Sequence, residues 1–263
     1  AGGAWLSIAV TVLWIVAVTN AMNFMDNMDG LSAGVGAIAG SLFLAAALLN
    51  AQWFVGATLA LLVGALAGFL VFNAPRLSGR GATIFMGDSG SLVVGFLLAV
   101  LTVRGTYLPP EAAGRDLSAG PWYALLMPVV VLAVPLYDLA SVVIIRLSQG
   151  KSPFVGDLQH LSHRLTRLGL SRRAAVVVIW GFTAATGITG VMLASLEPWQ
   201  AVLAGVQVLA LLGVLAIFEF ARARRAAQAA GEAAGQITHA SPASPRPAPA
   251  TPAPVSTAPE ARP

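Results

Sequence analysis

Polar side chains that could act on a phosphate or a sugar gather in three short stretches of an otherwise apolar chain. The first stretch alternates amides and carboxylates at a spacing of three residues. Because residues three apart share one face of a helix, we predict a ladder of oxygen ligands. Such a ladder suits a hard cation such as Mg²⁺, and its amides also suit a sugar or a base; helix capping is the simpler alternative. The ladder consists of Asn20, Asn23, Asp26 and Asp29.

The second stretch, FMGDSGSL at residues 85–92, places an acid among small residues ahead of an apolar segment. Its glycines allow a phosphate to approach the backbone closely, and the N–H groups that begin the next helix attract anions. The carboxylate of Asp88 would repel that phosphate unless a divalent cation lay between them. We therefore predict that Mg²⁺ bridges Asp88 and a pyrophosphate, with an ordinary cap and turn as the alternative.

The third stretch, residues 146–173, brings two histidines and several arginines into one loop. Histidine can ligate a metal, transfer a proton or donate to phosphate, and arginine pairs with phosphate through two parallel hydrogen bonds. An electrostatic anchor for anionic lipids is the alternative. The residues that we single out are His160, His163 and Arg164.

Asp138 lies inside an apolar segment, about 12 Å from its end at a helical rise of 1.5 Å per residue. A carboxylate inside a membrane is costly, which makes Asp138 a candidate functional residue. A structural pair with Arg146 is equally compatible with the sequence.

The elements that position these residues must be membrane helices. Hydrophobic residues make up 57% of the 263 residues and charged residues only 10%, against about 25% charged residues in a soluble domain. This composition excludes a soluble protein and, over most of the chain, disorder, while the absence of cysteine excludes disulfides and thiolate sites. We predict an all-α polytopic membrane protein, in which Pro128 and Pro135 break the fifth span. The seven spans are 4–22, 31–49, 53–72, 89–106, 121–146, 173–195 and 199–221.

The positive charges indicate an orientation in the membrane rather than a nucleic-acid partner. The chain has 15 Lys and Arg residues, and the loops on one side hold only Arg104 and Arg115. The positive-inside rule then places the other loops in the cytoplasm and the N-terminus outside. Residues 1–225 form the predicted membrane domain, and the Ala/Pro-rich residues 226–263 form a disordered cytoplasmic tail. The cytoplasmic loops are 20–30, 73–88 and 147–172.

The three stretches resemble the polyprenyl-phosphate N-acetylhexosamine-1-phosphate transferases of glycosyltransferase family 4. The resemblance rests on NAMNFMDNMDGL at 20–31, FMGDSGSL at 85–92 and HLSHRL at 160–165, and it covers residues 4–195. It implies a transfer of N-acetylhexosamine-1-phosphate from a UDP-sugar to undecaprenyl phosphate, with release of UMP and with Mg²⁺ or Mn²⁺ as cofactor. The implied setting is the bacterial plasma membrane, at the first membrane step of cell-envelope glycan synthesis, and a homodimer is compatible with it.

The resemblance also implies roles for individual residues. The implied catalytic residues are Asp26, Asp29, Asp88, His160 and His163. Asp88 and Asp26 would ligate the metal, whereas Asn20, Asn23, Phe85 and Arg164 would bind substrate, with Phe85 stacking near uracil.

Other features place the chain within the family and mark where it departs. The loop at 160–173 resembles the branch that uses UDP-GlcNAc-type donors more than the MurNAc-pentapeptide branch. Ser162 stands where many relatives have a third histidine, and Asn27 replaces a usual glycine. Family members carry further spans upstream with a pair of adjacent aspartates. We therefore expect an N-terminally truncated part of a longer enzyme, with little activity by itself.

Two other classes of function remain open on the sequence. A noncatalytic membrane paralogue, or a partner that binds lipid or nucleotide-sugar, would explain the chain without truncation and would bind without turnover. A transporter is weaker, because Asp138 is the only mid-span ionisable residue and no pair of spans resembles inverted repeats.

Overall fold

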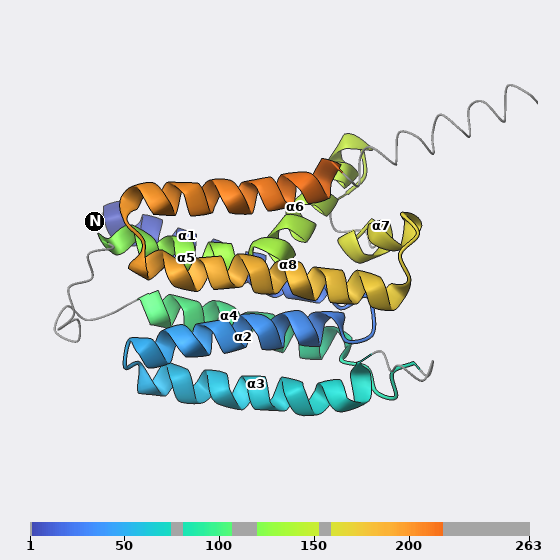
Figure 1. Ribbon diagram of the computed structural model, residues 1–263, viewed down its shortest axis with the longest axis horizontal. Helices are drawn as coiled ribbons and strands as arrows, with labels where there is room; N and C mark the ends of the chain where they lie inside the picture. Colours follow the sequence, from blue (N-terminus) through green and yellow to red (C-terminus); the bar gives the residue numbers. More distant parts are fainter. Residues whose placement is uncertain (1, 75–80, 107–119, 153–158, 218–263) are drawn as a thin grey trace, which may run out of the picture. The chain divides into compact units, whose positions relative to one another are not determined.

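The computed structural model describes residues 2–74, 81–106, 120–152 and 159–217, and the regular elements in these ranges are all helical (Figure 1). This confirms the predicted all-α fold. The helices are α1 (Gly2–Phe24), α2 (Leu31–Leu49), α3 (Trp53–Asn73), α4 (Gly87–Thr106), α5 (Gly120–Val131), α6 (Ala133–Ser148), α7 (Leu161–Arg167) and α8 (Arg172–Met192). The 3₁₀ turn η2 (Leu193–Ser195) and a last helix at Pro198–Ile217 follow.

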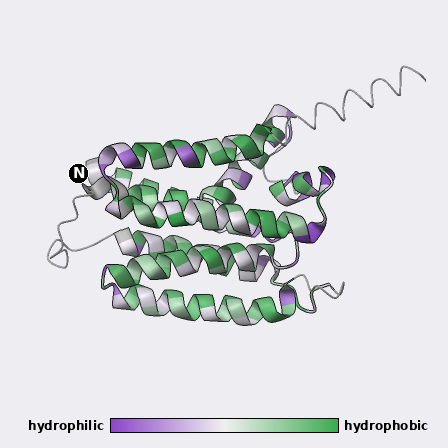
Figure 2. Cartoon of the chain, in the orientation of Figure 1, coloured by the Kyte–Doolittle hydropathy of each residue, from purple (hydrophilic) through white to green (hydrophobic). Residues whose placement is uncertain are grey.

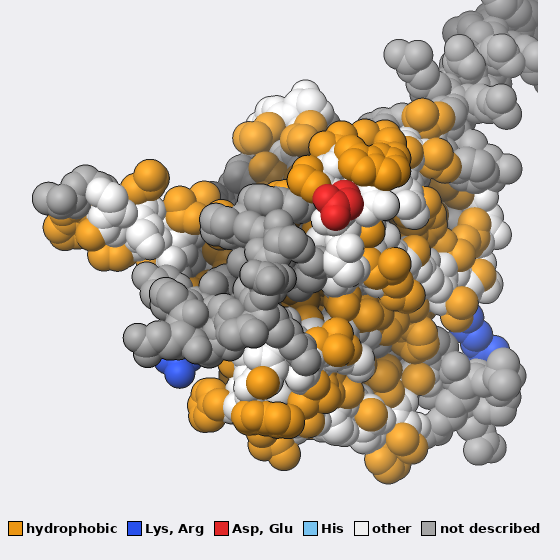
Figure 3. All heavy atoms as spheres, turned by 60° about the vertical axis from the view of Figure 1, so that its left-hand side comes forward, with side chains coloured by type: hydrophobic (Ala, Val, Ile, Leu, Met, Phe, Trp, Pro, Cys, Tyr) orange, Lys and Arg blue, Asp and Glu red, His pale blue; other side chains and the backbone are white. Residues whose placement is uncertain are grey.

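Most of these helices are long and apolar enough to cross a bilayer, which makes the chain a multi-pass membrane protein. Six helices meet this criterion singly, and α5 with α6 forms a bent pair that adds a seventh. Apolar residues run along them (Figure 2), and hydrophobic side chains cover much of the face seen in Figure 3. Inside a bilayer a helix satisfies its own backbone hydrogen bonds, so such segments stay helical without polar partners. The seven predicted spans agree with these helices to within a few residues.

The fifth span is broken as its prolines predict. α5 and α6 meet at an angle of 73°. Pro135 has no N–H to offer the carbonyl of Val131, and its ring presses against that carbonyl. The break therefore falls at Leu132, one turn before Pro135, whereas Pro128 lies inside α5 without ending it. The bend sends α6, which carries Asp138, between α1 and α8.

Small residues let the helices that carry the polar stretches pack closely. A Cβ at Gly95 of α4 would lie only 2.8 Å from the Cα of Thr19 in α1, so any side chain there would separate the two helices. A Cβ at Gly34 of α2 would overlap the ring of Trp180 in α8. Close approach through small residues is the usual way in which membrane helices associate. α1 thus packs on α4, and α2 packs on both α3 and α8.

The predicted tail at 226–263 lies outside the described residues, as do the loop residues 75–80 and 153–158. The predicted domain boundary at residue 225 therefore stays a prediction.

Candidate active site

The turn between α1 and α2 departs from the helical ladder expected from the sequence. α1 ends at Phe24, and residues 25–30 form turns that close on Gly30, which has a left-handed φ of 75°. The spacing of three aligns side chains only while the chain remains helical, so the predicted ladder is wrong. Asn20 and Asn23 belong to α1, whereas Asp26 and Asp29 belong to the turn.

Asn23 and Asp88 meet where the end of α1 lies against the start of α4. The Asn23 amide donates to Asp88 Oδ1 at 3.1 Å and to Ser91 Oγ at 3.0 Å. Ser91 is fully buried, whereas Asp88 is exposed in the first turn of α4. Asn23 therefore fixes the orientation of a carboxylate that remains open to a ligand.

Asp26 lies close enough to Asp88 for the two charges to repel each other. Burial and, to a smaller extent, this repulsion raise the pKa of Asp26 from 3.8 to about 6. Two neighbouring carboxylates resist ionising together unless a cation compensates them. We refer to Asn23, Asp26 and Asp88 as the carboxylate cluster.

Asp29 contacts the backbone of the segment that leads into α4. Its Oδ2 accepts a hydrogen bond from the N–H of Ala82 at 3.0 Å. Beside it, the buried amide of Asn73 accepts from the N–H of Gly30 and donates to the carbonyl of Ile84, both at 2.8 Å. These bonds hold the segment before α4, which includes Ala82 and Ile84, against the α1–α2 turn. The described contact of Asp29 therefore positions this segment.

The two other predicted substrate-binding residues of these stretches are both exposed. Asn20 is exposed, and its amide donates to the carbonyl of Val16 in its own helix at 2.8 Å. Phe85 is 78% exposed. Its ring is accessible from outside the protein, as stacking on a base would require.

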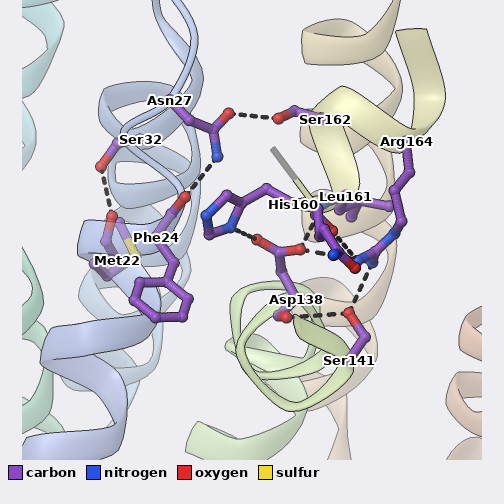
Figure 4. Close-up of polar contacts among 11 residues, drawn as sticks. Met22, Phe24, Asn27, Ser32, Asp138, Ser141, His160, Leu161, Ser162 and Arg164 are labelled. Carbon is purple, nitrogen blue, oxygen red and sulfur yellow. Dashed lines mark hydrogen bonds and ion pairs between the residues drawn. The ribbon is translucent and has the colours of Figure 1, made fainter. Parts of the chain in front are cut away.

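A second polar cluster is buried where α6 meets α7 (Figure 4). Asp138 has no exposed surface, and its carboxylate accepts from His160 Nδ1 at 3.2 Å and from the N–H of Leu161 at 2.6 Å. The guanidinium of Arg164 lies 3.6 Å from Asp138 Oδ1 and donates to Ser141 Oγ at 2.7 Å. We refer to Asp138, His160 and Arg164 as the histidine cluster.

The α1–α2 turn touches both clusters. The ring of Phe24 meets the imidazole of His160 edge-on, with centroids 5.1 Å apart and planes at 81°. Asn27 accepts a hydrogen bond from Ser162 of α7 (Figure 4). The guanidinium of the buried Arg146 lies over the ring of Phe24, with its Cζ 5.4 Å from the centroid. The three predicted stretches therefore converge at one end of the helices.

His163 is half-buried on α7 and has a different electrostatic setting from His160. Burial first, and then smaller electrostatic effects that include the guanidinium groups of Arg167 and Arg172, lower the pKa of His163 below its ordinary value. The imidazole is therefore neutral at pH 7 and can accept a proton.

The donor set for a divalent cation is small. Among the residues that the structure describes, no group of three or more His, Asp or Glu side chains could hold a metal ion. Mg²⁺, however, is usually bound by one or two carboxylates together with water and substrate phosphates. Asp26 and Asp88, the latter in the first turn of α4, fit that pattern.

Sequence reasoning missed three contributors to this region. Asn73 is an isolated amide at the end of an apolar helix, and that position alone was a signal. No sequence pattern marked Phe24 and Asn27, because their importance comes from contacts with His160 and Ser162, which are far away in the sequence. For Asp138 the sequence left a functional role and a pair with Arg146 open, and the described contacts of its carboxylate are with His160, Leu161 and Arg164.

Comparisons with known proteins agree with this picture. Residues 1–106 match the glycosyl transferase family 4. The chain is 31% identical to a probable undecaprenyl-phosphate N-acetylglucosaminyl 1-phosphate transferase of Bacillus subtilis, with 74% of this chain and 50% of the relative covered. It is 37% identical to the decaprenyl-phosphate N-acetylglucosaminephosphotransferase of Mycobacterium tuberculosis (66% and 44% covered). A third relative is the undecaprenyl-phosphate alpha-N-acetylglucosaminyl 1-phosphate transferase of Escherichia coli, at 32% identity (65% and 43% covered).

The chain spans about half the length of the curated relatives that it matches. The matched residues include the α1–α2 turn and the start of α4, which carry the carboxylate cluster. On this evidence the chain belongs to glycosyl transferase family 4.

Proposed function

We propose that the protein transfers N-acetylglucosamine-1-phosphate from UDP-N-acetylglucosamine to a polyprenyl phosphate, undecaprenyl phosphate in the first instance. The relatives carry N-acetylglucosamine-1-phosphate transfer and a polyprenyl phosphate in their names. The observation that carries the proposal is the carboxylate cluster. In it the amide of Asn23 orients the carboxylate of Asp88 at the start of α4, and Asp26 lies close by. This arrangement suits a pyrophosphate held through a divalent cation at the surface of a membrane.

In the proposed reaction an oxygen of the lipid phosphate attacks the β-phosphorus of the UDP-sugar. The bond from that phosphorus to the bridging oxygen breaks, and UMP leaves with the electron pair. Most of the barrier in such a transfer is lowered by positioning and by offsetting charge. Mg²⁺ held by Asp26 and Asp88 would supply that charge compensation.

The remaining work falls to side chains and backbone of this chain. Asn23 holds Asp88 in one orientation, and the N–H groups that open α4 favour an anion nearby. The exposed ring of Phe85 is available to stack on the uracil. His163, which is neutral at pH 7, can take up a proton from the incoming phosphate or stabilise the donor.

The setting follows from the charges of the loops. We propose that the loops with both clusters face the cytoplasm of a bacterium, where nucleotide-sugars are made, and that the product starts a cell-envelope glycan. The positive-inside rule supports this orientation, because these loops carry six Lys and Arg residues, whereas the loops on the other side hold only Arg104 and Arg115.

The test is UMP release from UDP-N-acetylglucosamine and undecaprenyl phosphate by the protein as its gene encodes it, in detergent or vesicles. Asp88→Asn should lower turnover by about a thousandfold, comparable to removing a principal source of transition-state stabilisation. The matched control is Glu197→Gln, an exposed acid after α8, which should keep parental turnover. A folded Asp88→Asn protein with parental turnover would contradict the proposal.

A further inference from the structure

The histidine cluster contains a residue that neither the predicted roles nor the proposed reaction uses. Asp138 has no exposed surface and lies in α6, six residues after the break in the fifth span. Its carboxylate does not face lipid or solvent, because the imidazole of His160, the N–H of Leu161 and the guanidinium of Arg164 surround it. A carboxylate kept inside a membrane protein at such a cost needs a function.

Asp138 acts on α7 in two ways. It accepts the N–H of Leu161, the first residue of α7, at 2.6 Å, and thereby caps a helix that has no side-chain cap of its own. It also lies 3.6 Å from the guanidinium of Arg164, which donates further to Ser141 and to the carbonyl of Gln159. The described contacts of Arg164 thus join α7 to α6, although the sequence suggested a phosphate ligand.

The same carboxylate decides which ring nitrogen of His160 carries the proton. Oδ2 of Asp138 lies 3.2 Å from Nδ1. A carboxylate only accepts hydrogen bonds, so the proton at this contact sits on Nδ1. Nε2 is then the nitrogen with the lone pair, and Figure 4 shows the ring directed from α7 toward the α1–α2 turn, with this nitrogen away from Asp138.

The surroundings hold the ring in that orientation. Phe24 packs edge-on against the imidazole from the end of α1, one residue after Asn23 of the carboxylate cluster. His160 itself is 8% exposed, so it has little freedom to turn over. An acid that orients a histidine through Nδ1 and frees Nε2 for chemistry is a recurrent arrangement in enzymes.

We propose that Asp138 is a positioning residue for the transfer: it fixes His160 as the Nδ1–H tautomer and directs Nε2 toward the donor phosphates beside the carboxylate cluster. This inference rests on the proposed function. It differs from a purely structural brace, because a brace would hold α7 without setting the tautomer.

The first measurement is the ¹⁵N spectrum of the protein labelled at histidine, with His160 assigned through its disappearance in His160→Gln. Nδ1 of His160 should have the shift of a protonated nitrogen and Nε2 that of an unprotonated one. The opposite pattern would overturn the proposal. The spectrum needs no turnover, so a protein that shows the expected pattern but releases no UMP would defeat the proposed function and leave this contact standing.

The second measurement uses Asp138→Asn, which keeps the shape but offers an amide in place of the carboxylate. The amide N–H₂ can donate to Nδ1, which moves the proton to Nε2, and kcat should fall by about a hundredfold as a proton-transfer or phosphate contact is lost. KM for the UDP-sugar should stay within about threefold, because ground-state binding is little changed. Parental kcat, or an unchanged His160 spectrum with lowered kcat, would overturn the proposal; if Asp138→Asn does not fold, the spectrum of the parent decides.

Discussion

The carboxylate cluster includes residues of the end of α1 and of the α1–α2 turn, and the histidine cluster contacts the end of α1 through Phe24. The two clusters differ in how they accommodate a carboxylate near a membrane. In the histidine cluster Asp138 is buried among an imidazole, a backbone N–H and a guanidinium, all supplied by this chain. In the carboxylate cluster Asp88 is exposed and receives an amide, while Asp26 adds a second negative charge. In the described residues the carboxylate of Asp138 has three donors, whereas Asp88 has one amide donor and a second acid nearby.

This difference indicates how the two clusters divide the work. A buried acid whose donors are all in place acts as a fixed part, and its removal leaves buried partners unsatisfied. Two neighbouring acids that repel each other, one of them exposed and the other half-buried, gain most from a cation. We therefore expect the histidine cluster to be set before substrate arrives and the carboxylate cluster to be completed by metal and substrate.

Removing the amide of Asn23, which lies between α1 and α4, tests the carboxylate cluster. Asn23→Ala deletes both hydrogen bonds that orient Asp88 and Ser91, and turnover should fall by about tenfold, which corresponds to about 1.4 kcal/mol. The measurement is steady-state UMP release. The matched control is Asn50→Ala at the C-terminal end of α2, whose amide donates to the carbonyl of Ala46 in its own helix. Equal losses in the two variants would show that the effect of Asn23 is structural and general.

An effect of similar size is expected from pH. The pKa of Asp26 is raised to about 6, so Asp26 becomes neutral as the pH falls through 6 and binds a cation less well. The Mg²⁺ concentration for half-maximal turnover should therefore rise as the pH is lowered from 7 to 5, by about tenfold per unit once protonation competes fully. Asp26→Asn, which has no proton to bind at this position, should lose that dependence in whatever turnover remains. A half-saturating Mg²⁺ concentration that is constant over this range would remove Asp26 from the metal site.

Much of the fold followed from the sequence, because hydropathy and proline act locally. The ends of the spans and the break before Pro135 depend on residues within one or two helical turns. The three polar stretches could also be placed at one end of the bundle, because alternate loops of a multi-pass protein lie on the same side.

The contacts within the site could not be predicted in the same way. The ladder failed because α1 stops at Phe24, although no proline or glycine lies between Phe24 and Gly30. The pairing of Asp138 with His160 spans 22 residues and depends on the bend of the fifth span and on the position of α7. Such contacts are set by tertiary packing, which cannot be predicted from the spacing of residues along the chain.

The division of labour between the clusters is the central claim, and binding of Mn²⁺ in place of Mg²⁺ tests it most directly. Free Mn²⁺ is followed by its electron paramagnetic resonance signal in titrations of the parent, Asp88→Asn and Asp138→Asn, each without nucleotide. We predict that Asp88→Asn weakens binding by at least about tenfold, since one of two carboxylate ligands is lost, whereas Asp138→Asn binds as the parent does. Parental binding by Asp88→Asn, or an equal loss in both variants, would contradict the account.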